Sequence, residues 1–355
     1  MTNRIPLALP LAIALAGCIP SVDRPARPAP SRPDAGGSYP PPRPGPRPQE
    51  QVEQLPAPPP AWEQRGVADD ARQVPDQTYV VRSGDSLRLI AERTGAGSEA
   101  IARANGLSAP FVIYAGQRLR IPGGRYHLVR SGQTGIAIAR AYGVEWSHIV
   151  AANALSEPYI LRTGQRILIP GDARPRSAAE RAAAFRLDID DIITGGEPAI
   201  AENQAPAKAV ATPRRVLPAT AAVAPPTSSP GRFMWPVDGR IVGRFGAGAS
   251  GQRNNGIKIA VPTETPVRAA ADGTVAYVGD GIAALGGLII VRHGENWTSV
   301  YGHASKLLVQ RGQAVKKGQT IALSGDTGFA DQPELHFELR KGRNPVDPTS
   351  QLPKR

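Results

Sequence analysis

The sequence contains a single cysteine, Cys18, so an intramolecular disulfide is excluded. Aromatic residues make up only 5% of the chain, which predicts small and lightly packed domains. The apolar stretch from Ile5 to Ala16 is shorter than the roughly 20 residues that a membrane-spanning helix needs. Lys and Arg are spread along the chain and form no clustered basic helix, so the net charge of +12 does not predict nucleic-acid binding.

Proline and glycine are abundant: 37 and 38 residues, about a fifth of the 355. This composition predicts two or three ordered domains joined by Pro-rich linkers. The basic charge favours an anionic partner such as an acidic polymer or a lipid surface.

The N-terminus has the features of a targeting signal. Arg4 precedes the apolar stretch, which ends in the tetrapeptide Leu15-Ala16-Gly17-Cys18. This tetrapeptide resembles the bacterial lipobox, which implies a signal peptide over residues 1–17 and an acylated Cys18. Because Ile19 and not Asp follows, the resemblance implies an outer-membrane lipoprotein that faces the periplasm. The alternative is an ordinary secretory signal with a chance cysteine. Residues 18–76 are rich in Pro, Arg and Gln and predict an extended, disordered tether.

Residues 77–123 and 125–171, here called the first and second repeats, share their motifs. The first has Ser83-Gly84-Asp85-Ser86, Ala104-Asn105-Gly106-Leu107 and Gly116-Gln117-Arg118-Leu119-Arg120-Ile121-Pro122; the second has Ser131-Gly132-Gln133-Thr134, Ala152-Asn153-Ala154-Leu155 and Gly164-Gln165-Arg166-Ile167-Leu168-Ile169-Pro170.

Each repeat predicts a strand, two helices and a closing strand. Asp85 or Ser86 can cap the first helix, and the pair Asn105-Gly106 closes the second. The second repeat has Gly135 where the first has Leu87, which predicts a first helix that starts late or a weaker binding site.

These motifs resemble the LysM domain, a small βααβ module that binds N-acetylglucosamine polymers. The resemblance places the glycan in a groove between the turn before the first helix and the loop after the second helix, here called the glycan groove. The implied glycan-binding residues are Gly84, Asp85, Ser86, Asn105, Leu107 and Ile113 in the first repeat, and Gly132, Gln133, Thr134, Asn153, Leu155 and Leu161 in the second. The alternative is that the Gly, Asn and Leu residues serve only turns and cores.

Residues 172–231 form a second predicted linker. Ser177 and Glu180 have the spacing of a capping box for a short helix over residues 177–193. Residues 205–230 are rich in Ala, Pro, Thr and Ser and predict a disordered spacer.

Residues 232–352 contain short strands at regular turn spacing, which predicts a mainly antiparallel β domain. Its landmarks are Trp235-Pro236-Val237, Tyr301-Gly302-His303, Leu335-His336-Phe337-Glu338 and Asn344-Pro345-Val346-Asp347-Pro348. Together they resemble the LytM, or lysostaphin-type, zinc peptidases. The predicted fold is therefore multidomain: two α+β modules and one β domain, joined by disordered linkers.

The resemblance also shows where the chain departs from active members of that family. Their first His and Asp ligands correspond to Asn254 and Lys258, whereas the third ligand is retained as His336. The family's other His in the last motif corresponds to Glu334, whereas its His in the middle motif is retained as His303. Zinc usually needs three ligands from His, Cys or carboxylate, so we expect neither a bound metal nor a catalytic residue. Glu334 with His336 and His303 leaves a rearranged zinc site as an alternative.

The order of lipobox, LysM and degenerate LytM is similar to that of amidase activators of the NlpD and EnvC type. The resemblance implies no cofactor, binding to peptidoglycan strands and to a periplasmic N-acetylmuramoyl-L-alanine amidase, and anchoring in outer-membrane lipid through Cys18. The expected partner-binding cleft is lined by Asn254, Lys258, Tyr301, His303, Glu334 and His336. The alternatives are an active zinc endopeptidase and a passive tether between outer membrane and wall.

Overall fold

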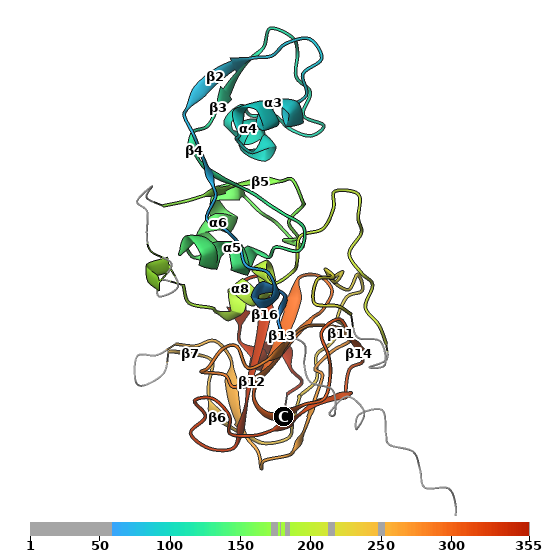
Figure 1. Cartoon of the computed structure of the whole chain (residues 1–355). Helices are drawn as coiled ribbons and strands as arrows, with labels where there is room; N and C mark the ends of the chain where they lie inside the picture. The colour runs from blue at the N-terminus through green and yellow to red at the C-terminus, as the bar shows by residue number, and fades with distance from the viewer. Residues whose placement is uncertain are drawn as a thin grey trace, which may run out of the picture. The chain divides into compact units, whose positions relative to one another are not determined.

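The computed structural model of the chain describes residues 59–171, 177, 179–181, 185–211, 217–247 and 253–354 (Figure 1). The predicted signal peptide and Cys18 lie outside these residues. Within the described ranges, no helix has the length and apolarity needed to cross a bilayer.

The first repeat forms the predicted βααβ unit. Its elements are β2 (Gln77–Val80), α3 (Leu87–Thr94), α4 (Ser98–Ala104) and β3 (Arg118–Ile121), and the two strands pair antiparallel. The Ser86 hydroxyl accepts a hydrogen bond from the Leu89 amide at 3.2 Å, as the capping prediction requires. Ile90, Ile101 and Leu119 are fully buried and hold the helices on the hairpin.

The second repeat repeats this unit and extends its sheet. Its elements are β4 (Gly124–Leu128), α5 (Gly135–Tyr142), α6 (Trp146–Asn153) and β5 (Arg166–Ile169), and β1 (Arg72–Val74) adds a strand in the order β1-β4-β5. The predicted late start of the first helix is wrong, because α5 begins at Gly135 and is capped by Thr134. A Cβ on Gly135 would lie 2.5 Å from the Trp146 ring. Glycine at this position therefore makes room for the Trp146 side chain.

The predicted tether is ordered at its C-terminal end. Helix α2 (Ala61–Gln64) carries Trp62, which is 9% exposed and stacks on Tyr277 with ring centroids 5.6 Å apart. Strand β1 lies in the same segment and pairs with β4. The predicted boundary of the disordered tether at residue 76 is therefore wrong. Apolar residues of this segment pack against residues far along the chain.

The described residues of the predicted linker between the repeats and the C-terminal domain also form ordered elements. The capping box is present, because the Ser177 amide donates to the Glu180 carboxylate and the Glu180 amide donates to the Ser177 hydroxyl. Residues 185–188 are not helical, and a separate helix, α8 (Ile189–Gly195), starts at the cap residue Asp188. The predicted spacer also makes isolated bridges, Ala207 with Val223 and Val210 with Gln313. The predictions of a single helix over 177–193 and of a disordered spacer are therefore both wrong.

The C-terminal domain is the predicted antiparallel β structure. Its main sheet has the order β14-β11-β12-β13-β16-β9-β6, while β10 and β15 pair with each other, β15 with β13, and β17 with β16. The elements are β6 (Arg240–Gly243), β7 (Gly246–Ala247), β8 (Arg253–Asn254), β9 (Ile257–Ala260), β10 (Pro266–Arg268), β11 (Gly273–Gly279), β12 (Gly287–Arg292), β13 (Trp297–Leu307), β14 (Ala314–Val315), β15 (Thr320–Ser324), β16 (Glu334–Lys341), β17 (Asn344–Val346) and α9 (Pro348–Gln351).

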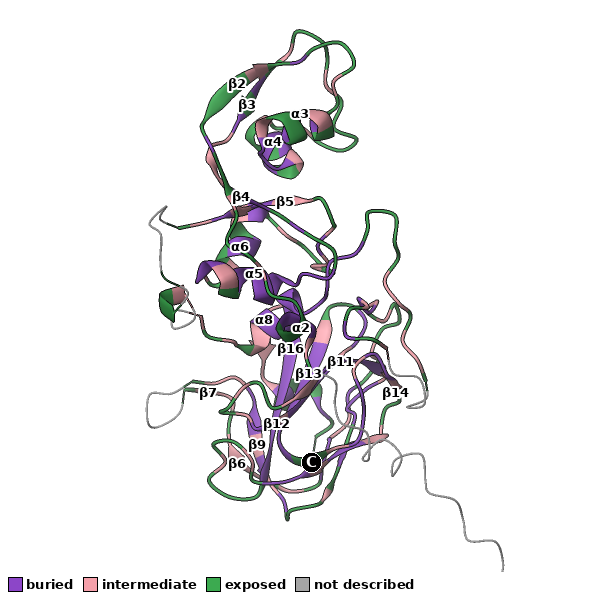
Figure 2. Cartoon of the chain, in the orientation of Figure 1, coloured by how far each residue is buried: buried purple, intermediate pink, exposed green. Residues whose placement is uncertain are grey.

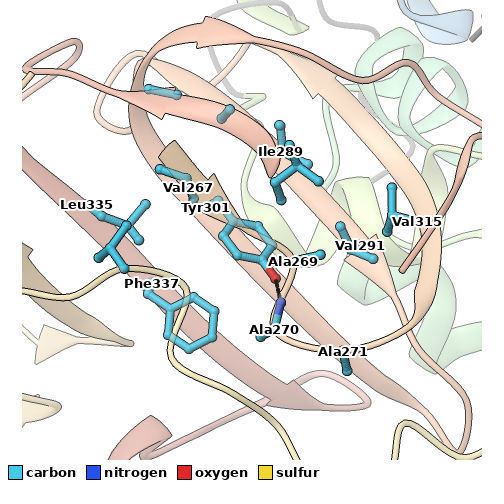
Figure 3. Close-up of a cluster of buried hydrophobic side chains, with 14 of the residues drawn as sticks. Val267, Ala269, Ala270, Ala271, Ile289, Val291, Tyr301, Val315, Leu335 and Phe337 are labelled. Atoms are coloured by element: carbon cyan, nitrogen blue, oxygen red, sulfur yellow. Dashed lines mark hydrogen bonds between the residues drawn. The ribbon is translucent and has the colours of Figure 1, made fainter. Parts of the chain in front are cut away.

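The main sheet buries both of its faces. One face forms the core shown in Figure 3, where Tyr301, Leu335 and Phe337 pack together and the Tyr301 hydroxyl accepts from the Ala270 amide at 2.8 Å. A second cluster joins side chains of β11, β12 and β13 to α2, α5 and α8, of which α5 and α8 are largely buried in Figure 2. Its buried members are Trp62, Ile136, Ala137, Ile192, Ile193, Ala276, Tyr277, Leu288, Ile290 and Val300.

Candidate functional site

Strand β16 carries polar and apolar residues in strict alternation. Leu335, Phe337 and Leu339 belong to the core of the sheet, so the alternate side chains point to the opposite face. Those side chains are Glu334, His336, Glu338 and Arg340, and none is more than 5% exposed. Four charged or titratable residues on one buried face need specific partners, because an unpaired buried charge is costly.

The register of the sheet brings part of the predicted site together. Lys258 on β9 and Gly302 on β13 both lie opposite His336, one on each side of β16. His303 follows Gly302, and its ring lies edge-on to that of His336, with centroids 5.9 Å apart. We call Lys258, His303, Glu334 and His336 the charged cluster.

An ion pair lies at the centre of the charged cluster. The Lys258 ammonium is 2.8 Å from the Glu334 carboxylate, whose side chain is 2% exposed, whereas that of Lys258 is 27% exposed. His303 Nε2 lies 3.8 Å from the same carboxylate oxygen. The lysine therefore neutralises a carboxylate that would otherwise be buried without a counter-charge.

His303 is held as a neutral imidazole. Its Nδ1 lies 2.8 Å from the Thr327 carbonyl, and because a carbonyl can only accept, Nδ1 carries the proton. Burial lowers the pKa of His303, although the Thr327 hydrogen bond opposes this. The residue has a φ of 66°, in the left-handed region that few side chains adopt outside constrained sites.

A row of hydrogen bonds runs along β16 away from His336. His336 Nε2 lies 2.9 Å from Glu338, and the other Glu338 oxygen accepts from Arg340 at 2.7 Å. Arg340 then donates to Asp190 of α8 at 2.5 Å. Burial raises the pKa of Glu338, but the bonds from His336 and Arg340 outweigh it and leave the pKa below its usual range. Nδ1 of His336 is buried and has no hydrogen-bond partner among the described residues.

Two predicted cleft residues lie apart from the charged cluster. Asn254 donates to the Arg244 carbonyl at 3.0 Å and accepts from the Gly256 amide, so its side chain serves a local turn. Tyr301 is fully buried in the core on the opposite face of the sheet, and its place in the cleft is a wrong prediction. The positive φ of His303 breaks the alternation of β13, so that Tyr301 and His303 face opposite ways.

Three residues of this network were missing from the predicted site: Glu338, Arg340 and Asp190. The first two carry a signal in the sequence, since charged residues at every second position of an otherwise apolar strand indicate a polar face. Asp190 carries none, because its contact with Arg340 joins segments 150 residues apart.

In the first repeat, the predicted glycan residues fall into two groups. Gly84 and Ser86 are exposed on the turn. Asp85 instead accepts hydrogen bonds from the Arg82 amide and the Tyr79 hydroxyl, which holds the pKa of its carboxyl below the usual range. Asn105 bridges α4 and β3 by bonds to the backbone of Ile101 and Arg120. Leu107 and Ile113 are half-buried and pack against the core.

In the second repeat, the corresponding residues are less accessible. Gly132, Gln133, Thr134, Asn153 and Leu161 are buried, and Leu155 is half-buried. Gln133 accepts from the Arg130 amide at 2.7 Å and lies 3.0 Å from His127. Burial lowers the pKa of His127, which keeps this pair neutral.

Comparison with known families agrees with the architecture of the two repeats and with that of the C-terminal domain. A model of "Peptidase family M23" matches residues 252–348, and a model of "LysM domain" matches residues 79–122 and 127–170.

Relatives are similar to this chain over different lengths. "Uncharacterized lipoprotein YgeR" of Escherichia coli is 30% identical over 275 residues, which cover 78% of this chain and 80% of that protein. "Murein hydrolase activator NlpD" of Salmonella typhimurium is 29% identical over 294 residues, 78% of this chain and 68% of that protein. "Lipoprotein NlpD/LppB homolog" of Pseudomonas aeruginosa is 47% identical over 125 residues, 35% of this chain and only 41% of its own length.

Proposed function

Because the chain belongs to the family of NlpD-type lipoproteins, in which LysM domains precede a Peptidase family M23 domain, we propose that it binds peptidoglycan and activates a wall amidase during cell separation. The name of its Salmonella relative, a murein hydrolase activator, supports this proposal. The chain itself cuts no bond in this account.

The observation that carries the proposal is the Lys258–Glu334 ion pair. An M23 peptidase needs a zinc ion, and the residues at its ligand positions here do not fit one. Lys258 places an ammonium 2.8 Å from the carboxylate that could have replaced a ligand, and Asn254 directs its amide to a backbone carbonyl. His336 alone remains of the expected set, whereas catalytic zinc has three protein ligands. Without a metal, no activated water is available for hydrolysis.

The charged cluster is proposed to bind a segment of the amidase. His336 Nδ1 lies within it without a hydrogen-bond partner among the described residues, and Lys258 is partly exposed beside it. A segment that pairs with these groups in only one conformation of the amidase shifts its population toward that conformation. The proposed partner is a periplasmic N-acetylmuramoyl-L-alanine amidase.

The remaining parts are proposed to place this cluster at the wall. Acylated Cys18 anchors the chain in the outer membrane, facing the periplasm, and at least one LysM groove holds a glycan strand. Two attachments on one chain keep the C-terminal domain at a high effective concentration near its partner.

The test is dye release from labelled sacculi by a soluble form of the chain that starts at residue 19 and so lacks the acylated Cys18, by a cognate amidase, and by the two together, with zinc present throughout. We expect release above the amidase's own level only in the mixture. Release by the chain alone, lost on chelation, would establish a zinc peptidase instead, and binding without stimulation would establish a tether.

A matched pair of variants locates the effect. Lys258→Gln should reduce stimulation at least several-fold because it changes the charged cluster. Lys316→Gln should not, because Lys316 is 82% exposed and its ion pair with Asp272 follows β14, at the opposite end of the main sheet from β9. Equal loss in both variants would contradict the assignment.

A further inference from the structure

A short segment of the predicted linker lies in the glycan groove of the second repeat. The Ala199 amide donates to the Gln133 carbonyl at 2.7 Å, and the Gly132 amide donates to the Ala199 carbonyl at 2.9 Å. On the other wall, the Ile200 amide donates to Leu161 at 3.2 Å and the Thr163 amide donates to Ile200 at 2.9 Å. Residues 198–200 therefore bond to the turn before α5 and to the loop after α6 at once.

The contact has the character of strand addition. Pro198 forms an antiparallel bridge with Thr134, and Ile200 forms a parallel bridge with Arg162. Ala199 is 2% and Ile200 4% exposed, so their side chains are buried along with the groove. Main-chain hydrogen bonds with alternate side chains in pockets are how extended peptides bind to sheet edges.

Both ends of the segment are fixed. On one side, Arg162 donates to the carbonyls of Ala201 and Gln204, at 3.2 and 2.8 Å. On the other, the Glu197 carboxylate is 4% exposed and pairs with Arg292 at 3.0 Å and Arg311 at 2.5 Å. The seated segment is thus joined directly to the C-terminal domain.

The first repeat provides a comparison within the same chain. Its equivalent backbone groups are the Gly84 amide, the Asp85 carbonyl, the Ile113 carbonyl and the Ala115 amide, and no described residue bonds to any of them. Gly84 and Ser86 are exposed there, whereas Gly132 and Thr134 are buried. Large apolar side chains also stand exposed on the loop of the first repeat: Phe111 at 42%, Val112 at 52% and Tyr114 at 71%.

From this contrast we infer that the groove of the second repeat is a binding site for an extended apolar peptide, filled by residues 198–200 of the chain itself, and that glycan is bound by the first repeat alone. The second half of this inference rests on the proposed binding of peptidoglycan. The second repeat then acts as a clasp that holds the linker and the C-terminal domain, not as a second wall anchor.

The first experiment measures stoichiometry. The soluble form that starts at residue 19 is titrated calorimetrically with a tetramer of N-acetylglucosamine. We expect one tetramer per chain, with at least tenfold weaker binding in Phe111→Ala and less than a twofold change in the matched variant Tyr159→Ala. Two tetramers per natural chain, or dependence on Tyr159 only, would overturn the inference.

The second experiment tests the peptide site without any glycan. In a triple variant, Pro198→Gly, Ala199→Gly and Ile200→Ser, the chain no longer fills its own groove. A labelled peptide of residues 197–204 should bind this variant at least tenfold more tightly than the natural chain, and a scrambled peptide should bind neither. Equal binding of the native-sequence and scrambled peptides to a variant that folds, judged by unchanged circular dichroism, would overturn the peptide site.

Hydrogen exchange in the unaltered chain covers the case in which the triple variant does not fold. The amides of Ala199 and Ile200 should be protected as strongly as those of α5, and rapid exchange there would overturn the inference. None of these readouts involves an amidase, so failure of the clasp and failure of activation are distinguishable.

Discussion

The side chain at position 258 decides the chemistry of the C-terminal domain. Its ammonium neutralises Glu334, which is 1% exposed and has no other cation within ion-pair distance among the described residues, since the His303 imidazole 3.8 Å away is neutral. Replacing it with an apolar residue leaves a buried carboxylate without its counter-charge.

Lys258→Met should therefore lower the free energy of unfolding by about 1–2 kcal/mol, less than for a fully buried pair because Lys258 is partly exposed. Chemical denaturation followed by circular dichroism measures this. Lys316→Met is the control and should change stability by no more than about 0.5 kcal/mol. Equal stabilities of both variants would show that the Lys258 ion pair contributes nothing.

Gly135 offers a second test at the scale of one residue. An alanine Cβ there would meet the Trp146 ring at 2.5 Å, so Gly135→Ala should destabilise the second repeat by about 1–3 kcal/mol despite the better helix propensity of alanine. Gly66→Ala is the control, because nothing lies within 4 Å of its added Cβ. Thermal unfolding compares the two, and a stabilised Gly135→Ala variant would contradict the packing described.

Among the elements, α8 contains a carboxyl group that makes the stability of the fold depend on pH. Burial, followed by the nearby Asp188 carboxylate, raises the pKa of Asp191 from 3.8 to about 7. The folded state therefore holds a proton that the unfolded state releases between these two values. The stabilisation that the bound proton gives the folded state is complete below pH 3.8. It is lost as the pH rises toward 7, by at most about 1.4 kcal/mol per pH unit.

Asp191→Asn should remove this dependence. The amide can still accept the bond from the Asp188 amide, so the variant should match the natural chain near pH 4 and be more stable at pH 8. Chemical denaturation of both chains at pH 4, 6 and 8 gives the difference between their free energies of unfolding. The contributions of the other titrating groups are the same in both chains and cancel in this difference. A difference that does not grow with pH would contradict the raised pKa.

The elements that the sequence predicts well are those whose signals are local. Ser86 as a cap, the Ser177–Glu180 box and the paired strands of each repeat depend on residues a few positions apart. What was missed depends on distant contacts. Trp62 reads as part of a Pro-rich tether because its partner, Tyr277, lies on another domain.

The site divides in the same way. The β16 positions Glu334 and His336 follow from motif and alternation, and the structure places them beside Lys258 and His303. Tyr301 was misplaced because the left-handed backbone of His303 is invisible in a sequence without a glycine at that position.

At the scale of the molecule, ion pairs join the predicted linker, whose residues 198–200 lie in the groove of the second repeat, to the C-terminal domain. One is Arg340 with Asp190, and the other is Glu197 with Arg292 and Arg311. Losing one partner of such a buried group leaves charges uncompensated, which typically costs about 3–5 kcal/mol.

Glu197→Ala should release the clasp before it unfolds either domain. Hydrogen exchange at Ala199 and Ile200 should accelerate at least tenfold, while exchange in β12 and β13 stays within a few-fold. Glu202→Ala is the control, since the Glu202 side chain is 65% exposed in its pair with Arg88 and should leave all rates unchanged. Unchanged exchange at Ala199 in Glu197→Ala would contradict the clasp.

The most direct test of the whole account identifies which bond is cut when the chain stimulates wall digestion. Products released from sacculi by the chain and amidase together are analysed by mass spectrometry. We expect free stem peptides with an alanine N-terminus and glycan strands without stems, which are the products of the amidase. Stems cut at their cross-links but still attached to muramic acid, released by the chain with a catalytically inactive amidase, would contradict it.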